Sequence, residues 1–200
     1  MSAYEFTQDW FHWAPPLLEQ LVPMLPERKR LLEIGAYEGR STVWFVENML
    51  EDGGAIVAID TWEGGEEHKA MGHNMKSVED RFNHNTGLLS AREQTRRRYI
   101  SKVKDTSYHA LAGLVDFPQF DFIYIDGSHV AKDVLTDACM AWPLLKPHGI
   151  MVFDDYLWRD PPHPLHRPKI AVDTFSNIFD GEFDVIHIGY QYAVRKKDTL

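Results

Sequence analysis

The chain has a single cysteine, Cys139. One cysteine cannot form an internal disulfide, and it cannot build a cysteine-based zinc site. It lies in an apolar helical pattern, Ala138 to Trp142, which favours packing in the core.

Long apolar runs are also lacking. No stretch approaches the roughly 20 apolar residues that are needed to cross a bilayer. The first residues, Met1 to Glu5, show neither the basic start nor the apolar core of a signal peptide. We therefore expect a cytoplasmic protein with no membrane partner.

Basic residues are outnumbered, since 21 Lys and Arg against 30 Asp and Glu give a net charge of -9. General electrostatic attraction to nucleic acid requires a basic face, so nucleic acid is a disfavoured partner. The local exception is a group of arginines at positions 92, 96, 97 and 98. Such a group can meet a phosphate-bearing substrate, but it is more often a solvated helix face.

Apolar runs of about five residues alternate with helical stretches, which is the pattern of βαβ units and a mainly parallel sheet. The 200 residues suit one α/β domain. We predict a doubly wound, Rossmann-like fold with a seven-stranded sheet that ends in a C-terminal antiparallel hairpin. The expected strands are Arg30 to Gly35, Ala55 to Asp60, Ile100 to Lys104, Asp121 to Asp126, Ile150 to Asp154, Phe183 to Ile188 and Tyr190 to Arg195, the last two joined by Gly189 alone. The expected helices are Ser41 to Leu50, Val130 to Leu145 and Ile170 to Phe179, with residues 1–29 as an N-terminal helical segment.

Two segments depart from this alternation. Residues 61–99 are too long for a simple crossover, and residues 156–168 hold four prolines, which disfavour regular helix or strand. Long loops in a compact domain are usually lids or binding loops. We expect both segments to cover a substrate.

The first strand runs into a glycine turn with the pattern E-x-G-x-x-x-G, from Glu33 to Gly39. Ligands of open α/β sheets bind beside this turn, where Gly35 lets the backbone approach a ligand and Gly39 lets the next helix pack close to the strand. Tyr37 stands where the dinucleotide fingerprint needs a second glycine, which disfavours a dinucleotide. The pattern that remains suits a ligand without a diphosphate whose cationic amino acid end lies near the negative charge of Glu33.

Polar residues also follow the next two strands. Asp60 ends the second strand and can accept both hydroxyls of a ribose, while Trp62 can pack on an adenine or on the substrate. Asp105 and Thr106 follow the third strand, within reach of an adenine edge. An Asp after a strand is also an ordinary helix cap, but polar residues at the ends of three consecutive strands favour a nucleoside site.

These motifs resemble the class I S-adenosylmethionine-dependent methyltransferases. The likeness is strongest to the metal-assisted O-methyltransferases related to catechol O-methyltransferase and the macrolide-sugar O-methyltransferases. It spans Arg30 to Tyr156 and the terminal hairpin. The most specific segments are Glu33 to Ser41, Ala58 to Asp60, Asp121 to His129 and Gly149 to Tyr156.

The resemblance implies a set of cofactor contacts. The methionine end of S-adenosylmethionine would be held by Glu33, Gly35, Tyr37, Gly39 and Ser41, the ribose by Asp60, and the adenine side by Asp105 with Thr106. The expected cofactor-binding set is completed by Ala36, Thr61, Trp62 and Asp126.

The resemblance also implies a metal site, because the family's metal carboxylates match Asp126, Asp154 and Asp155. Neighbouring parallel strands bring their carboxyl ends together, and carboxylates that meet without a cation repel one another. Oxygen ligands suit Mg²⁺ or Mn²⁺, which would lower the pKa of an acceptor hydroxyl. His129 stands where catechol-type relatives place a lysine base, so His129 and Asp126 are the expected catalytic residues. The alternative is that the aspartates cap helices or contact the cofactor without an ion, and that His129 is structural.

The sequence thus predicts a methyltransferase that acts on a hydroxyl of a small-molecule acceptor. A nicotinamide-dependent oxidoreductase on a similar fold is one alternative, although Tyr37 conflicts with it. A non-catalytic cofactor-binding module is the other, and the retained aspartates disfavour it. The acceptor stays open among sugar, phenol, peptide and nucleotide, and so does a homodimer.

Overall fold

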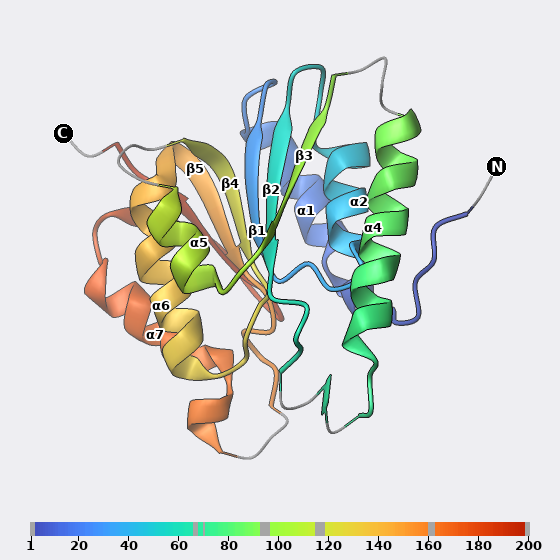
Figure 1. Cartoon of the computed structure of the whole chain (residues 1–200). Coiled ribbons are helices and arrows are strands. Elements are labelled where there is room, and N and C mark those ends of the chain that lie inside the picture. Colours follow the sequence, from blue (N-terminus) through green and yellow to red (C-terminus); the bar gives the residue numbers. More distant parts are fainter. Residues whose placement is uncertain are drawn as a thin grey trace.

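A seven-stranded sheet between two layers of helices makes up the computed structural model, which describes residues 3–65, 68–69, 71–92, 97–114, 119–159 and 163–198 (Figure 1). The strands are β1 (Arg30–Ile34), β2 (Ala55–Asp60), β3 (Tyr99–Lys104), β4 (Phe120–Ile125), β5 (Leu145–Phe153), β6 (Phe183–Ile188) and β7 (Tyr192–Lys196). They lie in the order β3-β2-β1-β4-β5-β7-β6. The first five strands are parallel, and β7 is antiparallel to both β5 and β6. The predicted Rossmann-like fold with a C-terminal hairpin is confirmed.

Helices cover both faces of the sheet. One face carries α1 (Pro15–Leu21), α2 (Arg40–Asn48) and α4 (Met75–Arg92), and the other carries α5 (Ser107–Gly113), α6 (Ala131–Ala141) and α7 (Pro168–Ile178) (Figure 1). Short 3-10 helices occur at η1 (Trp10–Trp13), η2 (Val22–Met24), η3 (Trp142–Leu144) and η4 (Pro164–His166). Within the described ranges, no helix has both the length and the apolar character to cross a membrane.

Alternate residues of each central strand face opposite helical layers. Leu31 and Phe122 belong to the core beneath α1 and α2, while Leu32 and Ile123 belong to the core beneath α6 and α7. All four side chains are fully buried. Strands covered on both faces are apolar throughout, and this is why they stand out in the sequence.

The segment 61–99 is not one long loop. Its described part contains α4, an 18-residue helix that follows β2 and precedes β3. Its described part has Val78, Phe82 and Leu89 as fully buried apolar side chains, and most of its other residues are polar. So narrow an apolar stripe gives a weak helical signal in the sequence. Positions 66–67, 70 and 93–96 of this segment lie outside the described residues, as does the side chain at position 92.

The other proline-rich segment, 156–168, is described at 156–159 and 163–168. It holds the short helix η4, and α7 begins at its last residue, Pro168. Positions 160–162, which include two of the four prolines, lie outside the described residues.

Two predicted boundaries near the C-terminal half are wrong. The fifth strand begins at Leu145 rather than Ile150, because α6 ends at Ala141 and the short helix η3 that follows, with Pro143 as its second residue, ends at Leu144. The hairpin is joined by Gly189 to Gln191 rather than by one residue. Reversing the chain between antiparallel strands takes at least two residues in its commonest forms.

Candidate active site

The residues that follow the central strands meet at one edge of the sheet. The backbone ladder continues one residue past the strand ends, since the Gly35 N–H donates to the Ile59 carbonyl at 2.9 Å. In the same way the Asp126 N–H donates to the Ile34 carbonyl at 2.8 Å. The strand order reverses between β1 and β4, and open α/β sheets bind their ligands at such a switch point.

Gly35 brings the turns after β1 and β4 into contact. Its φ of +88° lies in the left-handed region, and a Cβ at this position would stand 1.9 Å from the backbone oxygen of Asp126. A side chain has no room there, so the glycine turn and Asp126 can lie against each other only because residue 35 is glycine.

Asp60 braces the glycine turn. Its Oδ2 accepts the backbone N–H groups of Ala36 and Tyr37, each at 2.9 Å, and its Oδ1 accepts the Trp62 N–H at 2.7 Å. A carboxylate has about four acceptor positions, so these three bonds leave capacity for a ligand hydroxyl. Ala36 itself is buried beneath the turn.

Trp62 supports the same turn from inside the protein. Its Nε1–H donates to the Tyr37 carbonyl at 2.8 Å, and its ring packs on Phe82, with centroids 4.7 Å apart. Only 3% of the side chain is exposed. The indole is therefore part of the core and does not offer a face to an adenine, contrary to the sequence-based expectation.

Glu33 is fully buried at the start of the turn and accepts hydrogen bonds from the hydroxyls of Ser41 and Thr42, the latter at 2.5 Å. Burial raises its pKa to about 7, against the opposing effect of the two hydroxyl donors. These two hydrogen bonds connect β1 to the first turn of α2. The residue before α2 is Gly39, whose φ is +80°.

The expected adenine-side residues lie on the neighbouring strand end. The Asp105 N–H donates to the Asp60 carbonyl at 3.2 Å, and both Asp105 and Thr106 are exposed. The Thr106 hydroxyl caps α5 by accepting the His109 N–H at 3.3 Å. Thr61 is partly exposed beside them.

Three metal-type donors converge after β4 and β5. Asp126, His129 and Asp155 each offer a donor atom, and these atoms lie within 4.8 Å of one another. The His129 Nε2 is 2.9 Å from Asp155 Oδ2, and its ring packs on Trp158 with centroids 4.2 Å apart. The Tyr190 hydroxyl donates to Asp155 Oδ1 at 2.6 Å.

Asp154, an expected ligand, stands outside this group. It is buried, and its Oδ2 accepts the Tyr124 hydroxyl at 2.6 Å. Its Oδ1 accepts the Gln191 amide at 2.8 Å and the Asp155 N–H at 3.0 Å. With both oxygens engaged, Asp154 fixes the turn that presents Asp155, whose φ of 54° is left-handed.

Three carboxyl groups, those of Asp126, Asp154 and Asp155, lie close together at this edge. Burial raises the pKa of Asp126 well above its usual range, and the carboxylates of Asp154 and Asp155 raise it further. Burial together with Asp155 also raises the pKa of Asp154 to about 6. Within the described residues, no Lys or Arg forms an ion pair with these three aspartates. A cation bound here would relieve the repulsion among them.

Sequence reasoning missed the polar residues that hold these aspartates in place. Tyr190 and Gln191 come from the hairpin connection, and they reach the end of β5 because β7 pairs with β5 through Phe153 and Tyr192. Sequence order alone would place β6, not β7, beside β5. Without the strand order there was no signal that could have found them.

We expect Glu33→Gln to reduce the loss of stability that the protein suffers as the pH rises. Between the ordinary pKa of 4.5 and the raised value of about 7, the native state keeps a proton that the unfolded chain has lost. Native stability therefore falls through this window and levels off above it. Gln carries no such proton, so the difference in unfolding free energy between wild type and variant should change by on the order of 3 kcal/mol at most.

Urea denaturation across this pH range measures the effect. Glu19→Gln, at an exposed position, removes the same formal charge and should follow the wild-type profile. Parallel profiles for wild type and Glu33→Gln would show that the Glu33 proton does not matter for folding.

Comparison with known proteins places this site in a family. The profile of a methyltransferase domain matches residues 32–156, while no curated protein matches the chain. Among solved structures, the O-methyltransferase TomG from Streptomyces achromogenes, involved in tomaymycin synthesis and solved with S-adenosylmethionine, aligns with a TM-score of 0.61 and 18% identity over 91% of this chain and 78% of that one. An O-methyltransferase from Bacillus cereus, in complex with S-adenosylhomocysteine, aligns with a TM-score of 0.56 and 18% identity over 98% of this chain and 84% of that one.

A third structure contains a metal. MycE, a methyltransferase of the mycinamycin biosynthetic pathway solved with Mg, S-adenosylhomocysteine and mycinamycin VI, aligns with a TM-score of 0.61 and 17% identity over 95% of this chain. The alignment covers 51% of MycE, so this chain spans about half of that protein's length. At such identities the three likenesses establish the shared fold. The family is established by the domain match, which runs from within β1 to the turn after β5 and includes the glycine turn, Asp60 and the three metal-type donors: the chain belongs to the S-adenosylmethionine-dependent methyltransferases.

Proposed function

We propose that this methyltransferase transfers its methyl group to a hydroxyl oxygen of a small-molecule acceptor, with a divalent cation bound by Asp126, His129 and Asp155. The observation that carries the proposal is the convergence of these three donors beside the glycine turn. The fold shared with two O-methyltransferases, and with a methyltransferase solved with Mg, agrees with it.

The donor set fits a divalent cation. Two carboxylates suit Mg²⁺ or Mn²⁺, and the imidazole of His129 moves the preference toward a transition metal such as Mn²⁺. When bound, such an ion lowers the pKa of a neighbouring hydroxyl. Asp154 and Tyr190 act through Asp155, since each hydrogen bonds to it and fixes its position.

His129 has two candidate roles at this site. Its Nε2 already faces Asp155, which favours a place in the cation site. The role of proton acceptor, expected from the sequence, requires the ring to give up that contact when the acceptor hydroxyl arrives. Loss of metal affinity in a His129 variant supports the first role, and a slower reaction at full metal occupancy supports the second.

The cofactor is proposed to lie along the glycine turn from Gly35 to Gly39. Its ammonium and sulfonium groups are cationic, and the carboxyl groups of Glu33, Asp60 and Asp126 lie at this edge of the sheet. Burial raises the pKa of Glu33 and of Asp126, and a cationic ligand beside them would favour their ionised forms. The loop before α4 adds contacts to this region. The Tyr37 hydroxyl lies 2.7 Å from His73 Nδ1. We propose the described part of residues 61–74 as a cover for the cofactor.

Asp60→Ala should weaken S-adenosylhomocysteine binding by roughly 1.5 to 3 kcal/mol, the range for hydrogen bonds to a charged group. Isothermal titration calorimetry measures the loss, with Asp80→Ala on the exposed side of α4 as a control. Because Asp60 also braces the turn, an analogue that lacks the ribose 2′-hydroxyl separates the two roles. Wild type should bind this analogue more weakly, whereas Asp60→Ala should bind both ligands alike. Equal affinity of wild type for both ligands would contradict the ribose contact.

The reaction itself is tested by transfer of an isotope-labelled methyl group from S-adenosylmethionine. The acceptor panel holds phenols, sugars and matched amines, assayed with Mg²⁺ or Mn²⁺. Product with the label on oxygen supports the proposal. Label found only on nitrogen would overturn the assignment to hydroxyl acceptors, and binding of the cofactor with no transfer to any acceptor would favour a non-catalytic module.

A further inference from the structure

The segment 3–13, which precedes α1, lies against α4 and the glycine turn (Figure 1). These residues form no strand and only the short helix η1. A segment without its own backbone ladder depends on other hydrogen-bond partners to stay in place. The partners here are side chains of the glycine turn, of α2 and of α4.

Glu38, in the glycine turn, binds both the segment and α4. Its side chain is 1% exposed, and its two oxygens accept the Thr7 N–H and the Thr7 hydroxyl, each at 2.6 Å. The Arg81 Nε–H of α4 donates to the same carboxylate at 2.6 Å, which pairs this buried group with a cation. A single carboxylate therefore joins the segment 3–13, the glycine turn and α4.

Asn85 of α4 adds a second attachment and is fully buried. Its Oδ1 accepts the Glu5 N–H at 2.8 Å, and its Nδ2 donates to the Glu5 carbonyl at 2.9 Å. The same Nδ2 donates to the backbone carbonyl of Glu38 at 2.9 Å. Buried polar groups that have all found partners favour one arrangement of the chain, because breaking it leaves them unsatisfied.

Arg40, the first residue of α2, holds the next part of the segment. Its Nε–H donates to the Gln8 carbonyl at 2.9 Å, and its guanidinium lies over the Phe6 ring, 4.4 Å from the ring centroid. Residues 5–8 are thus attached on both sides of Gly39.

The attached segment carries Trp10 onto Tyr37. The centroids of these two rings are 5.0 Å apart, and the Trp10 ring is also nearly parallel to the His73 ring, with centroids 5.8 Å apart. The Tyr37 hydroxyl in turn lies 2.7 Å from His73 Nδ1. Three segments therefore meet at the turn along which the cofactor is proposed to lie: residues 3–13, the turn itself and the loop before α4.

We infer that Glu38 is a positioning residue for cofactor binding, which holds the segment 3–13 on the glycine turn and so keeps Trp10 over Tyr37 as a wall of the cofactor site. The inference rests on the proposed place of the cofactor along this turn. Docking of the segment then favours cofactor binding, and cofactor binding favours docking by the same factor. An attachment that serves only the fold would show no such coupling.

Hydrogen exchange of the full chain, with and without saturating S-adenosylhomocysteine, measures one side of this coupling. The N–H groups of Glu5 and Thr7 report on docking, since they donate to Asn85 and Glu38. Their exchange should slow about tenfold when the ligand binds, within the usual range of coupling between sites. Slower exchange in residues 33–41 but not in residues 5–8 would overturn the inference and keep the cofactor site. No change in either segment would place the cofactor elsewhere, and the inference would fall with it.

Glu38→Gln and Thr7→Val measure the other side of the coupling by calorimetry with S-adenosylhomocysteine. Glu38→Gln sets an amide NH₂ among hydrogen-bond donors, so it should weaken binding about tenfold, and the ligand should no longer slow exchange in residues 5–8. Thr7→Val removes one hydroxyl and leaves the pair with Arg81 intact, so it should weaken binding about threefold. Thr7→Val decides the matter if Glu38→Gln does not fold.

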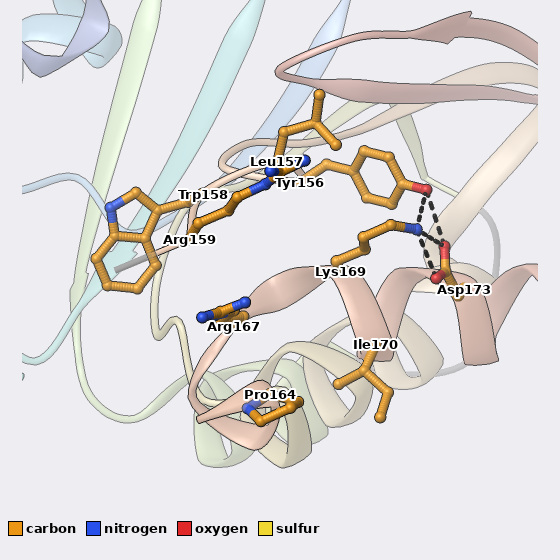
Figure 2. Close-up of a pocket in the computed structure, with 9 residues that line it drawn as sticks. All are labelled: Tyr156, Leu157, Trp158, Arg159, Pro164, Arg167, Lys169, Ile170 and Asp173. Atoms are coloured by element: carbon orange, nitrogen blue, oxygen red, sulfur yellow. Dashed lines mark hydrogen bonds and ion pairs between the residues drawn. The ribbon is translucent and has the colours of Figure 1, made fainter. Parts of the chain in front are cut away.

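Asp173→Asn is the matched control for Glu38→Gln. Asp173 also accepts hydrogen bonds from a hydroxyl, that of Tyr156 at 2.9 Å, and from a cation, Lys169 at 2.7 Å (Figure 2). It lies on α7, in the other helical layer, and should bind S-adenosylhomocysteine as wild type does when replaced.

Thr136→Val, at an exposed position of α6, is the matched control for Thr7→Val and should also keep full affinity. Unchanged affinity in a folded Glu38→Gln variant, or in Thr7→Val where that variant does not fold, would overturn the inference. Equal losses in the two controls would overturn it as well, because they would show that the effect does not depend on the segment 3–13.

Discussion

Removal of divalent cations is expected to abolish methyl transfer while leaving S-adenosylhomocysteine binding nearly unchanged. Asp126, His129 and Asp155 lie after β4 and β5, whereas the glycine turn and Asp60 lie after β1 and β2. A chelator should therefore empty one site and spare the other, and added Mg²⁺ or Mn²⁺ should restore turnover. Full activity in excess chelator would show that the enzyme works without an ion.

Variants of the cation site should reproduce the effect of the chelator. Asp155→Ala should lose turnover at low metal concentration, because it removes a proposed ligand. Asp154→Asn should keep the site but lower its metal affinity by roughly 10- to 100-fold, because the hydrogen bond from the Asp155 N–H to Asp154 fixes the position of Asp155. Asp80→Asn, an exposed substitution on α4, is the control.

His129→Gln separates the two proposed roles of the imidazole. If His129 is a general base, the rate should fall by roughly 10²-fold to 10⁴-fold at saturating metal. If it is a ligand, added metal should recover much of the rate. Titration of Mn²⁺, followed by electron paramagnetic resonance alongside the activity, distinguishes these outcomes.

The second large effect is expected for Gly35→Ala. The new Cβ would meet the Asp126 carbonyl oxygen at 1.9 Å, and backbone on both sides leaves no flexible group to move aside. We expect a loss of more than about 4 kcal/mol in unfolding free energy, or a protein that does not accumulate in folded form. Urea denaturation and S-adenosylhomocysteine binding measure the change.

Gly181→Ala is a matched control for the backbone strain alone. Gly181 has a φ of +87°, close to the +88° of Gly35, but a Cβ there meets nothing within 4 Å. Its cost should stay near the roughly 1 to 2 kcal/mol of an alanine in the left-handed region. Similar losses in both variants would show that the contact between the two turns is unimportant.

The central strands and the glycine turn could be predicted because their signals are local. β1, β2 and β4 are buried on both faces, so each is a short apolar run, and the polar residues that matter follow directly after it. Parallel strands carry such residues to a common edge whatever the sequence between them. For this reason Gly35, Asp60 and Asp126 could be grouped before their positions were known.

Other features depended on contacts between distant segments. α4 buries Val78 and Phe82 but is otherwise mostly polar, so its place in the sheet–helix layers was not visible in its own sequence. The role of Trp62 was also hidden, because an aromatic residue after a strand fits a binding pocket and a core equally well. In the structure the Trp62 ring packs on Phe82 and is part of the core.

The sequence by itself determined the fold class, the family, and the edge of the sheet at which we propose that the ligands bind, since these follow from short motifs and their order. The tertiary structure decided which donors meet. In the folded chain Asp154 accepts hydrogen bonds from Tyr124 and Gln191, whereas Asp126, His129 and Asp155 lie close to one another. The tertiary structure also brought the segment 3–13 onto the glycine turn through Glu38. The physical reason is that side-chain direction at the strand ends depends on left-handed turns and on the pairing of β7 with β5, which join residues far apart in the chain.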